Sequence, residues 1–289
     1  MKNIIVRALS GAVYVALIVC SMLFCGSWGF PLLCCLFIAI GIVEFQKMTG
    51  VDFHSSPRTL LVDILIGISL PLTVMSLYGF DIVMAVTMFA VAVTLCLMRL
   101  VMQLYSHQPD TLRRVQVSLT SIAYVAVPLA MACALGLTFG WPLLLLVFVM
   151  IWLNDTGAFL VGSAIGSHRL FPRLSPKKSW EGFFGGMLFA IAAGVVAAEV
   201  PAISRYFYGY NAWALAGLGL LVSLMATWGD LFESMIKRQA GVKDSGHLIP
   251  GHGGILDRID SLLFVAPASL VYLSISYFFL NMFMLIQGA

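Results

Sequence analysis

The sequence has few charged residues and no long hydrophilic stretch. Only 10% of its 289 residues are Asp, Glu, Lys or Arg, whereas a soluble globular domain carries about 25%. Hydrophobic residues make up 61% of the chain, and its mean hydropathy is +1.00. This composition excludes an ordinary soluble domain and indicates a polytopic membrane protein built as one membrane-embedded domain, residues 1–289.

The cysteines and histidines lack the spacing of metal ligands or of a disulfide framework. All six cysteines fall inside apolar stretches, and none forms a Cys-x-x-Cys pair. His54, His107 and His168 are isolated from one another. A zinc site and a set of disulfides are therefore not expected. The first apolar stretch is too long for the hydrophobic region of a signal peptide, so we expect it to be retained.

Long apolar runs predict an all-α fold of about nine transmembrane helices, because a helix needs about 20 apolar residues to cross the hydrocarbon core. The predicted spans are residues 4–24, 28–48, 59–78, 82–104, 117–138, 142–166, 182–200, 210–232 and 261–283. Residues 105–116 are expected to be a surface connection.

The basic residues support this count of spans. With the amino terminus in the cytoplasm, all 16 Lys and Arg residues except Arg205 fall on the cytoplasmic side, as the positive-inside rule expects. The loops at 167–181 and 234–260 then share the cytoplasmic face. Residues 1–140 form an apolar helical half, and residues 141–289, which contain both loops, are expected to be the catalytic half.

Residues 234–260 form a charged, glycine-containing run between two apolar stretches. On a helix, Asp230, Glu233, Ser234 and Lys237 would share one face. A second acidic pair, Asp257 and Asp260, is spaced three residues apart where the last span begins. Acidic pairs on consecutive helices can converge on Mg²⁺, which prefers carboxylate oxygen. The alternative is charge pairing at the membrane interface, for example of Glu233 with Lys237.

A glycine-rich turn precedes Asp257. Gly251, Gly253 and Gly254 could wrap a phosphate with their amide groups, and the same glycines would suit a tight turn into the last helix. His252 could contact phosphate or cap that turn.

A second polar group lies in the sixth predicted span and the loop that follows it. Asn154 and Asp155 interrupt an apolar run, which in a membrane usually marks a functional position. Ser175 and Pro176 are expected to begin a helix, with Lys177 and Lys178 near its positive end, where a triphosphate would be attracted. Alternatively, the two lysines only anchor the chain at the cytoplasmic surface, with Trp180 in the aromatic belt.

The run Ser234-x2-Lys-Arg-x4-Lys-Asp-x5-Pro-x-His-Gly-Gly-x2-Asp-Arg-x-Asp260 resembles the signature of the phosphatidate cytidylyltransferase family. Residues 154–159 and 175–182 resemble the second sequence block of that family. The detailed similarity covers roughly residues 150–265, and the first half is alike only in being a set of apolar spans. Phe159 departs from the pattern, because the family often has Tyr there.

The resemblance implies transfer of the cytidylyl group of CTP to phosphatidic acid, giving CDP-diacylglycerol and pyrophosphate for phospholipid biosynthesis. It implies a requirement for Mg²⁺, with a second cation open, and CTP, phosphatidic acid and membrane lipids as partners. A homodimer is compatible with it, and no nucleic-acid partner is expected. The short amino terminus suggests a bacterial cytoplasmic (inner) membrane protein with several spans.

The resemblance also implies roles for individual residues. Catalytic roles are expected for Asp230, Ser234, Lys237, Lys243, Asp244, Asp257 and Asp260. Substrate-binding roles are expected for Asp155, Ser175, Lys177, Lys178, Arg238, His252, Gly253, Gly254 and Arg258. The expected metal ligands are Asp230, Asp257 and Asp260.

Two other functions remain open from the sequence. A CDP-alcohol phosphotransferase also uses aspartates on membrane helices, but its Asp-Gly-x2-Ala-Arg-x8-Gly-x3-Asp-x3-Asp run is absent here. A cation-coupled secondary transporter could use Asp155 and Asp230 beside broken helices. The polar groups here cluster towards one face, whereas a transporter would spread them along a pathway across the membrane.

Overall fold

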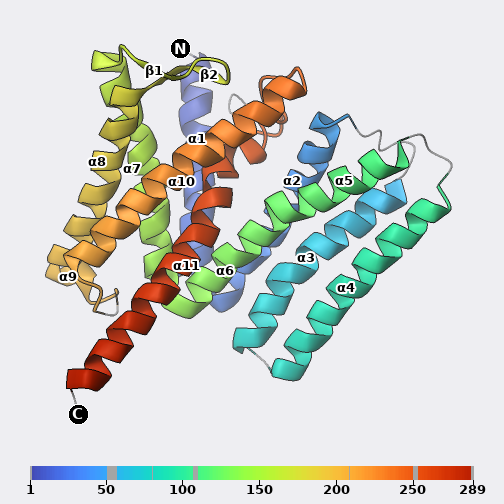
Figure 1. The fold of residues 1–289 in the computed structure, drawn as a ribbon, viewed down its shortest axis with the longest axis horizontal. Helices are drawn as coiled ribbons and strands as arrows, with labels where there is room; N and C mark the ends of the chain where they lie inside the picture. The colour runs from blue at the N-terminus through green and yellow to red at the C-terminus, as the bar shows by residue number, and fades with distance from the viewer. Residues whose placement is uncertain are drawn as a thin grey trace. The chain divides into compact units, whose positions relative to one another are not determined.

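The computed structural model describes residues 2–50, 57–79, 81–106, 110–207, 209–249 and 253–287, most of them helical (Figure 1). The first half contains α1 (Lys2–Leu23), α2 (Gly26–Met48), α3 (Pro57–Gly79), α4 (Ile82–Leu104), α5 (Thr111–Ser121), the π-helical turn η1 (Ile122–Ala126) and α6 (Val127–Phe139). The second half contains α7 (Trp141–Ile165), β1 (Arg169–Phe171), β2 (Ser175–Ser179), α8 (Trp180–Glu199), α9 (Pro201–Ser204), α10 (Ala212–Gln239) and α11 (Leu256–Gln287).

The predicted fold class, an all-α polytopic membrane protein, is confirmed. Among the described residues, eight helical segments are long and apolar enough to cross a membrane, and the segment Thr111–Phe139 combines α5, η1 and α6. The predicted first span forms α1, whose apolar part among the described residues is the shorter segment Leu9–Leu23. Its crossing of the membrane stays a prediction.

The expectation of a surface connection over residues 105–116 is wrong in that α5 begins at Thr111, although most of residues 111–116 are exposed. The polar side chains of α5 make contacts that a helix can provide. Arg113 donates to the backbone carbonyl of Thr49 at 3.0 Å, and Ser118 donates to the carboxylate of Asp63 at 2.6 Å. These two contacts tie α5 to the end of α2 and to α3.

The chain forms two compact units that do not coincide with the two predicted halves. Unit 1 consists of Met1–Thr138 and Met235–Leu263, and unit 2 of Phe139–Ser234 and Phe264–Ala289. Helices α10 and α11 therefore each contribute residues to both units. The expectation of one membrane-embedded domain stays a prediction.

A buried polar network joins four helices of unit 1. Asp63 of α3, with 1% of its side chain exposed, pairs with Arg99 of α4 at 2.9 Å between Oδ1 and Nε. Gln46 of α2 donates to the other oxygen at 2.9 Å, and Ser118 of α5 donates to Oδ1. A buried charge is costly unless it is paired and hydrogen-bonded, so this network holds α2, α3, α4 and α5 in one arrangement.

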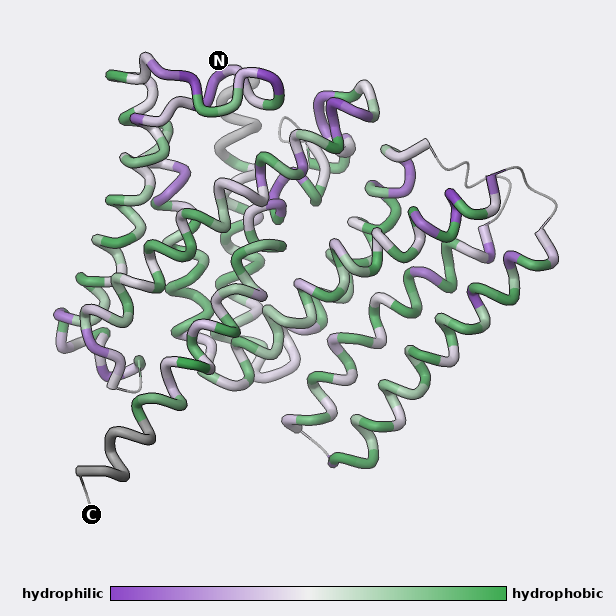
Figure 2. The backbone as a smooth tube through the Cα atoms, viewed as in Figure 1, coloured by the Kyte–Doolittle hydropathy of each residue, from purple (hydrophilic) through white to green (hydrophobic). Residues whose placement is uncertain are grey.

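Glycines allow α7 and α8 of unit 2 to pack closely, side by side (Figure 1). A Cβ atom at Gly182 would lie 2.8 Å from the carbonyl oxygen of Ala158, and one at Gly186 would lie 2.6 Å from that of Asn154. Small residues are what permit such close approach between membrane helices. Both helices are apolar along most of their length, apart from Asn154 and Asp155 of α7, and hydrophilic residues gather in the hairpin that connects them (Figure 2).

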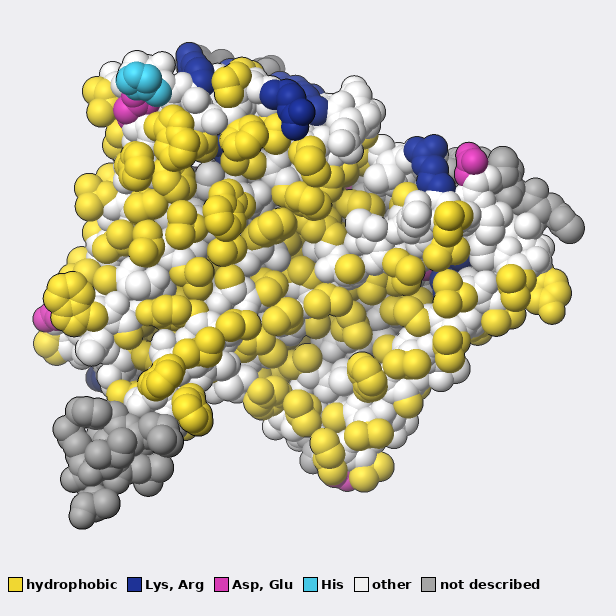
Figure 3. All heavy atoms as spheres, viewed as in Figure 1, with side chains coloured by type: hydrophobic (Ala, Val, Ile, Leu, Met, Phe, Trp, Pro, Cys, Tyr) yellow, Lys and Arg dark blue, Asp and Glu magenta, His cyan; other side chains and the backbone are white. Residues whose placement is uncertain are grey.

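The outer surface of unit 2 fits an apolar environment. Large hydrophobic side chains of α7 and α8 are exposed, among them Leu160, Phe184 and Leu188. Hydrophobic side chains cover the visible face of this unit in Figure 3, while charged side chains gather at the end where the hairpin lies. This distribution is expected for helices that contact lipid and a hairpin that contacts the membrane surface.

The Asp63–Arg99 pair generates a stability prediction. Replacing Arg99 by Met leaves a buried carboxylate without its counter-charge and should lower the free energy of unfolding by about 3–5 kcal/mol. The double variant Asp63→Asn/Arg99→Met removes both charges and should recover much of that loss. Unfolding in detergent, followed by circular dichroism, measures both effects. Equal stability of Arg99→Met and the unmodified protein would contradict this account.

Candidate active site

The connection between α7 and α8 is an antiparallel hairpin in which Arg169 of β1 lies opposite Ser179 of β2. The prediction that Ser175 caps a helix is wrong, because Ser175–Ser179 is a strand and the helix begins at Trp180. Ser179 is the cap, and its hydroxyl accepts a hydrogen bond from the amide of Gly182 at 3.1 Å. Strand pairing accounts for the difference, because Ser175 lies opposite Phe171 and Ser179 opposite Arg169, which keeps this segment extended.

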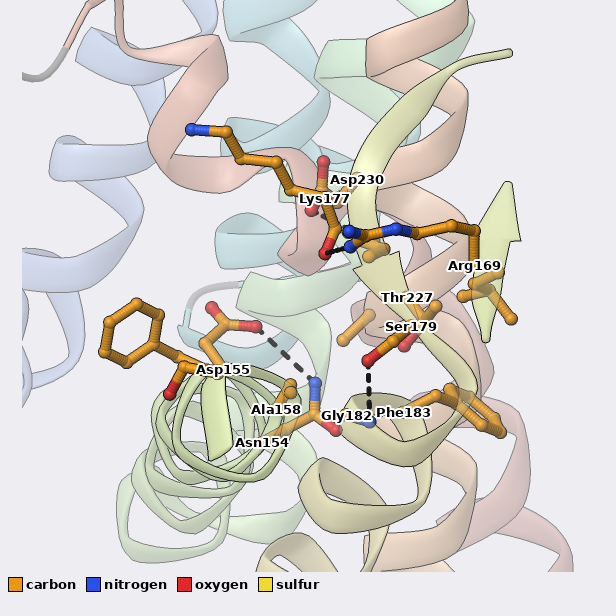
Figure 4. Close-up of a pocket in the computed structure, with 16 residues that line it drawn as sticks. Asn154, Asp155, Ala158, Arg169, Lys177, Ser179, Gly182, Phe183, Thr227 and Asp230 are labelled. Carbon is orange, nitrogen blue, oxygen red and sulfur yellow. Dashed lines mark hydrogen bonds and ion pairs between the residues drawn. The ribbon is translucent and has the colours of Figure 1, made fainter. Parts of the chain in front are cut away.

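A cavity of about 490 Å³ lies within unit 2, between α7, the hairpin, α8 and α10 (Figure 4). Its polar lining residues are Asn154, Asp155, Ser163, Arg169, Lys177, Lys178, Ser179, Thr227 and Asp230. The structure thus brings together five of the residues expected from the sequence: Asn154, Asp155, Lys177, Lys178 and Asp230. Phe159 also lines the cavity, with 73% of its surface exposed.

Opposite charges meet in this cavity. Lys178 Nζ lies 2.5 Å from Asp230 Oδ2, and the two side chains are 26% and 37% exposed. Ser234 donates to the other oxygen of Asp230 at 3.3 Å. Ion pairs with this exposure contribute little to stability, so both partners remain available to a charged ligand.

Two further side chains of α10 belong to this region: Thr227 lines the cavity, and Ser223 supports it through Asn154. The hydroxyl of Ser223, which is fully buried, donates to Asn154 Oδ1 at 2.7 Å. The amide nitrogen of Asn154 in turn lies 3.5 Å from a carboxylate oxygen of Asp155. The sequence analysis missed Ser223 and Thr227, although with Asp230 they follow the helical spacing i, i+4 and i+7.

Arg169 is a third basic residue of the cavity, and it was assigned no role from the sequence. One of its terminal nitrogens donates to the backbone carbonyl of Lys177 at 3.4 Å, so it also braces the two strands (Figure 4). The cavity therefore presents Arg169, Lys177 and Lys178 against the carboxylates of Asp155 and Asp230. This excess of basic side chains beside two carboxylates suits a polyphosphate accompanied by a cation.

A second polar cluster, in unit 1, is centred on Asp257. One carboxylate oxygen accepts a hydrogen bond from Lys237 Nζ at 2.7 Å. The other accepts from the amide of Ser245 at 2.9 Å, from its hydroxyl at 2.9 Å and from the amide of Gly254 at 2.8 Å. Four donors therefore surround this carboxylate, and the Gly254 amide, expected to meet a phosphate, is directed to Asp257 instead.

The remaining expected residues lie around this cluster. Arg238, Lys243 and Asp244 are exposed, whereas Arg258 and Asp260 are partly buried. Gly253 has a φ of +81°, which favours glycine, and its carbonyl accepts from the Ile249 amide at 2.9 Å. His252 lies outside the described residues. These positions agree with the alternative in which the glycines form the turn into the last helix.

No group of three or more Asp, Glu, His or Cys side chains within the described ranges is arranged to hold a metal ion. Asp230 belongs to unit 2, and Asp257 and Asp260 belong to unit 1. Shared coordination of a cation by the three aspartates therefore stays a prediction.

Taken together, the fold and the cavity define a polytopic helical membrane protein in which basic and acidic side chains line one cavity. Comparison with protein families then shows which family of membrane proteins this is. Residues 5–276 match the model described as the cytidylyltransferase family, and the chain belongs to this family.

Individual relatives agree with this assignment. The chain is 47% identical over 130 residues to a Staphylococcus aureus (strain COL) protein named phosphatidate cytidylyltransferase, covering 44% of this chain and 47% of the relative. It is 41% identical over 151 residues to a Staphylococcus haemolyticus (strain JCSC1435) protein of the same name, covering 52% and 55%. The matched region thus spans about half the length of these curated relatives.

Proposed function

We propose that this protein transfers the cytidylyl group of CTP to phosphatidic acid, forming CDP-diacylglycerol and pyrophosphate. The observation that carries the proposal is the cavity in which Arg169, Lys177 and Lys178 face Asp155 and Asp230, in a chain of the cytidylyltransferase family. The name of the staphylococcal relatives supports phosphatidate as the acceptor.

The reaction needs positioning more than an activated side chain. A phosphate oxygen of phosphatidic acid attacks the α-phosphorus of CTP, and the bond from that phosphorus to the bridging oxygen of pyrophosphate breaks. The lipid phosphate is already a nucleophile. The protein must align it with the α-phosphorus and stabilise the negative charge that develops on pyrophosphate. Lysine and arginine side chains at the cavity can do both.

The carboxylates of the cavity fit a divalent cation. Asp230 is part-exposed, its partners among the described residues are Lys178 and Ser234, and Asp155 lines the same cavity. Mg²⁺ is typically bound by one or two carboxylates together with substrate phosphates. Asp230, assisted by Asp155, would hold the cation, which would neutralise phosphate charge. Lys178 would then exchange Asp230 for a phosphate oxygen.

Asp257 and Asp260, which belong to unit 1, are the other two metal ligands that the sequence predicts. Oδ2 of Asp257 already accepts three hydrogen bonds, and Oδ1 accepts one from Lys237, so a cation bound at Oδ1 would lie beside the Lys237 ammonium. We therefore propose that Asp257 mainly positions Lys237. Asp260 lies three residues further along, on the same face of α11. Lys237 and Arg238 would help to place phosphatidic acid, while Lys177 and Lys178 would bind the phosphates of CTP.

The orientation follows from the basic residues. We place the amino terminus and both polar loops on the cytoplasmic side of a bacterial inner membrane, where CTP is available, and a homodimer is compatible with this arrangement. Single cysteines at positions 172 and 247, introduced into a cysteine-free background, should be shielded from a membrane-impermeant reagent added outside. Labelling of either position from outside would show that the orientation is reversed.

Pyrophosphate release by the purified protein tests the reaction. It should require CTP, phosphatidic acid and Mg²⁺ together, which neither a transporter nor a CDP-alcohol phosphotransferase would show. Asp230→Asn should reduce turnover at least about 100-fold, comparable with the loss of a strong electrostatic element of an active site.

Asp81→Asn is the matched control for this substitution. Asp81 caps α4 in unit 1 by accepting a hydrogen bond from the Val83 amide, and Asn caps helices equally well. The control should therefore keep its activity. Near-normal turnover of a folded Asp230→Asn variant would mean that the cation is bound elsewhere.

The proposed division between the two basic pairs can be measured separately. Replacing Lys177 and Lys178 by Gln should raise the KM for CTP more than the KM for phosphatidic acid, provided that substrate dissociation is faster than chemistry. Arg173→Gln changes a basic residue of the same hairpin that does not line the cavity, and it should leave both KM values unchanged. Equal effects of the lysine substitutions on both substrates would refute the division.

A further inference from the structure

Glu44 is a buried carboxylate on α2 that the sequence analysis did not assign to any role. It lies in the apolar first half, and only 7% of its surface is exposed. Its partners are nevertheless in the segment that contains the sequence signature, more than 200 positions further along the chain. Glu44 Oε1 accepts a hydrogen bond from the amide of Ile255 at 3.0 Å, and Oε2 accepts from the amide of Leu256 at 2.9 Å.

These two amides lie at the start of α11, which begins at Leu256. The first amides of a helix have no partner within the helix, and a negative charge is favoured near them. Such a partner normally comes from a neighbouring residue in the sequence. Here it comes from a different helix, so Glu44 fixes the start of α11 relative to α2.

The same carboxylate contacts the residues that surround Asp257. The hydroxyl of Ser245 lies 3.2 Å from Glu44 Oε2 and 2.9 Å from Asp257 Oδ2. A serine hydroxyl has a single proton, so it can donate to only one of the two carboxylates at a time. Ser245 therefore links Glu44 directly to the carboxylate that holds Lys237.

Two glycines leave the space that Glu44 occupies. A Cβ atom at Gly246 would lie 2.7 Å from Glu44 Oε1, and all three of its nearest neighbours would be atoms of the Glu44 side chain. A Cβ atom at Gly254 would meet Glu44 and the Ser245 hydroxyl. The backbone on both sides of the turn thus closes directly around this carboxylate.

We infer that Glu44 is a positioning residue of the active site. It holds the turn from Ser245 to Asp257, and through that turn the ion pair between Asp257 and Lys237. Because Glu44 is buried, we assign it no direct contact with either substrate. This role rests on the proposed function, since it concerns the alignment of Lys237 and the acidic residues at the start of α11 for cytidylyl transfer.

Kinetics of Glu44 variants separate positioning from a contribution to stability alone. Glu44→Ala should lower kcat by roughly 10- to 100-fold, because small displacements of a reacting group carry losses of this size. The KM values for both substrates should change little. In Glu44→Gln, the amide nitrogen would face a backbone N–H donor, and we expect a smaller loss of kcat.

Gln46→Met is the matched control. Gln46 is also buried, lies two positions further along α2, and donates to Asp63 and Ser121 rather than to the turn. This variant should lose thermal stability but keep the kcat of each folded molecule. If Glu44→Ala behaves in the same way, with a lower melting temperature and unchanged kcat, Glu44 only supports packing and the inference is wrong.

Gly246→Ala provides an independent test of the inference, which can be used even if Glu44→Ala does not fold. The added methyl group would displace Glu44, so kcat should fall in the otherwise unmodified protein. In the Glu44→Gln background the turn is already disturbed, so Gly246→Ala should lower kcat by a smaller factor there than it does in the unmodified protein. Strictly additive effects of the two changes would show that they act through unrelated contacts.

Hydrogen–deuterium exchange distinguishes failure of this inference from failure of the proposed function. Glu44→Gln should raise the exchange of the amides of Ser245, Gly254, Ile255 and Leu256 above that of the Gln46→Met control. This result does not depend on which reaction the protein catalyses. Absence of pyrophosphate release from the unmodified protein would refute the proposed function, whereas unchanged exchange in this segment would refute the role of Glu44.

Discussion

A carboxylate placed among apolar helices must be surrounded by donors, because an unpaired charge or a lost hydrogen bond there has no water to replace it. Three buried or part-buried acidic residues of unit 1 show how this constraint organises the chain. Asp63 accepts hydrogen bonds from α2, α4 and α5, and Glu44 accepts from the amides at the start of α11. Asp257 binds both Lys237 and the turn that precedes α11. Each connects elements that are distant in the sequence, so satisfying these charges also specifies which helices pack together.

The acidic residues of the two units differ in what surrounds them, and this difference separates their roles. Asp257 accepts four hydrogen bonds within the protein. Asp230 instead lines a cavity and makes a part-exposed pair with Lys178. A carboxylate with four donors around it holds a fixed geometry, whereas one in an exposed pair can change partners when a charged ligand arrives. The exchangeable groups therefore lie where the nucleotide is proposed to bind.

Glycine serves two purposes around these sites. Between α7 and α8 it permits close contact of helix backbones, since a Cβ atom at Gly182 or Gly186 would meet a carbonyl oxygen of the other helix. At Gly246 and Gly254 it leaves room for the side chain of Glu44. In both places the missing side chain lets a polar group approach the backbone. Packing around Glu44 accounts for Gly246 and Gly254, and the contact of Gly253 and Gly254 with phosphate stays a prediction.

The sequence alone determined the fold class and most of the membrane helices, because hydrophobic runs of sufficient length reflect the thickness of the bilayer. It also indicated the family, through a linear run of residues from Ser234 to Asp260. Spacing within one helix predicted that Asp230 and Ser234 share a face, and their hydrogen bond confirms it. Only the tertiary structure showed that Lys237 binds Asp257 and that Glu44 caps α11. Periodicity describes neighbours along one helix, whereas these contacts depend on how separate segments meet in space.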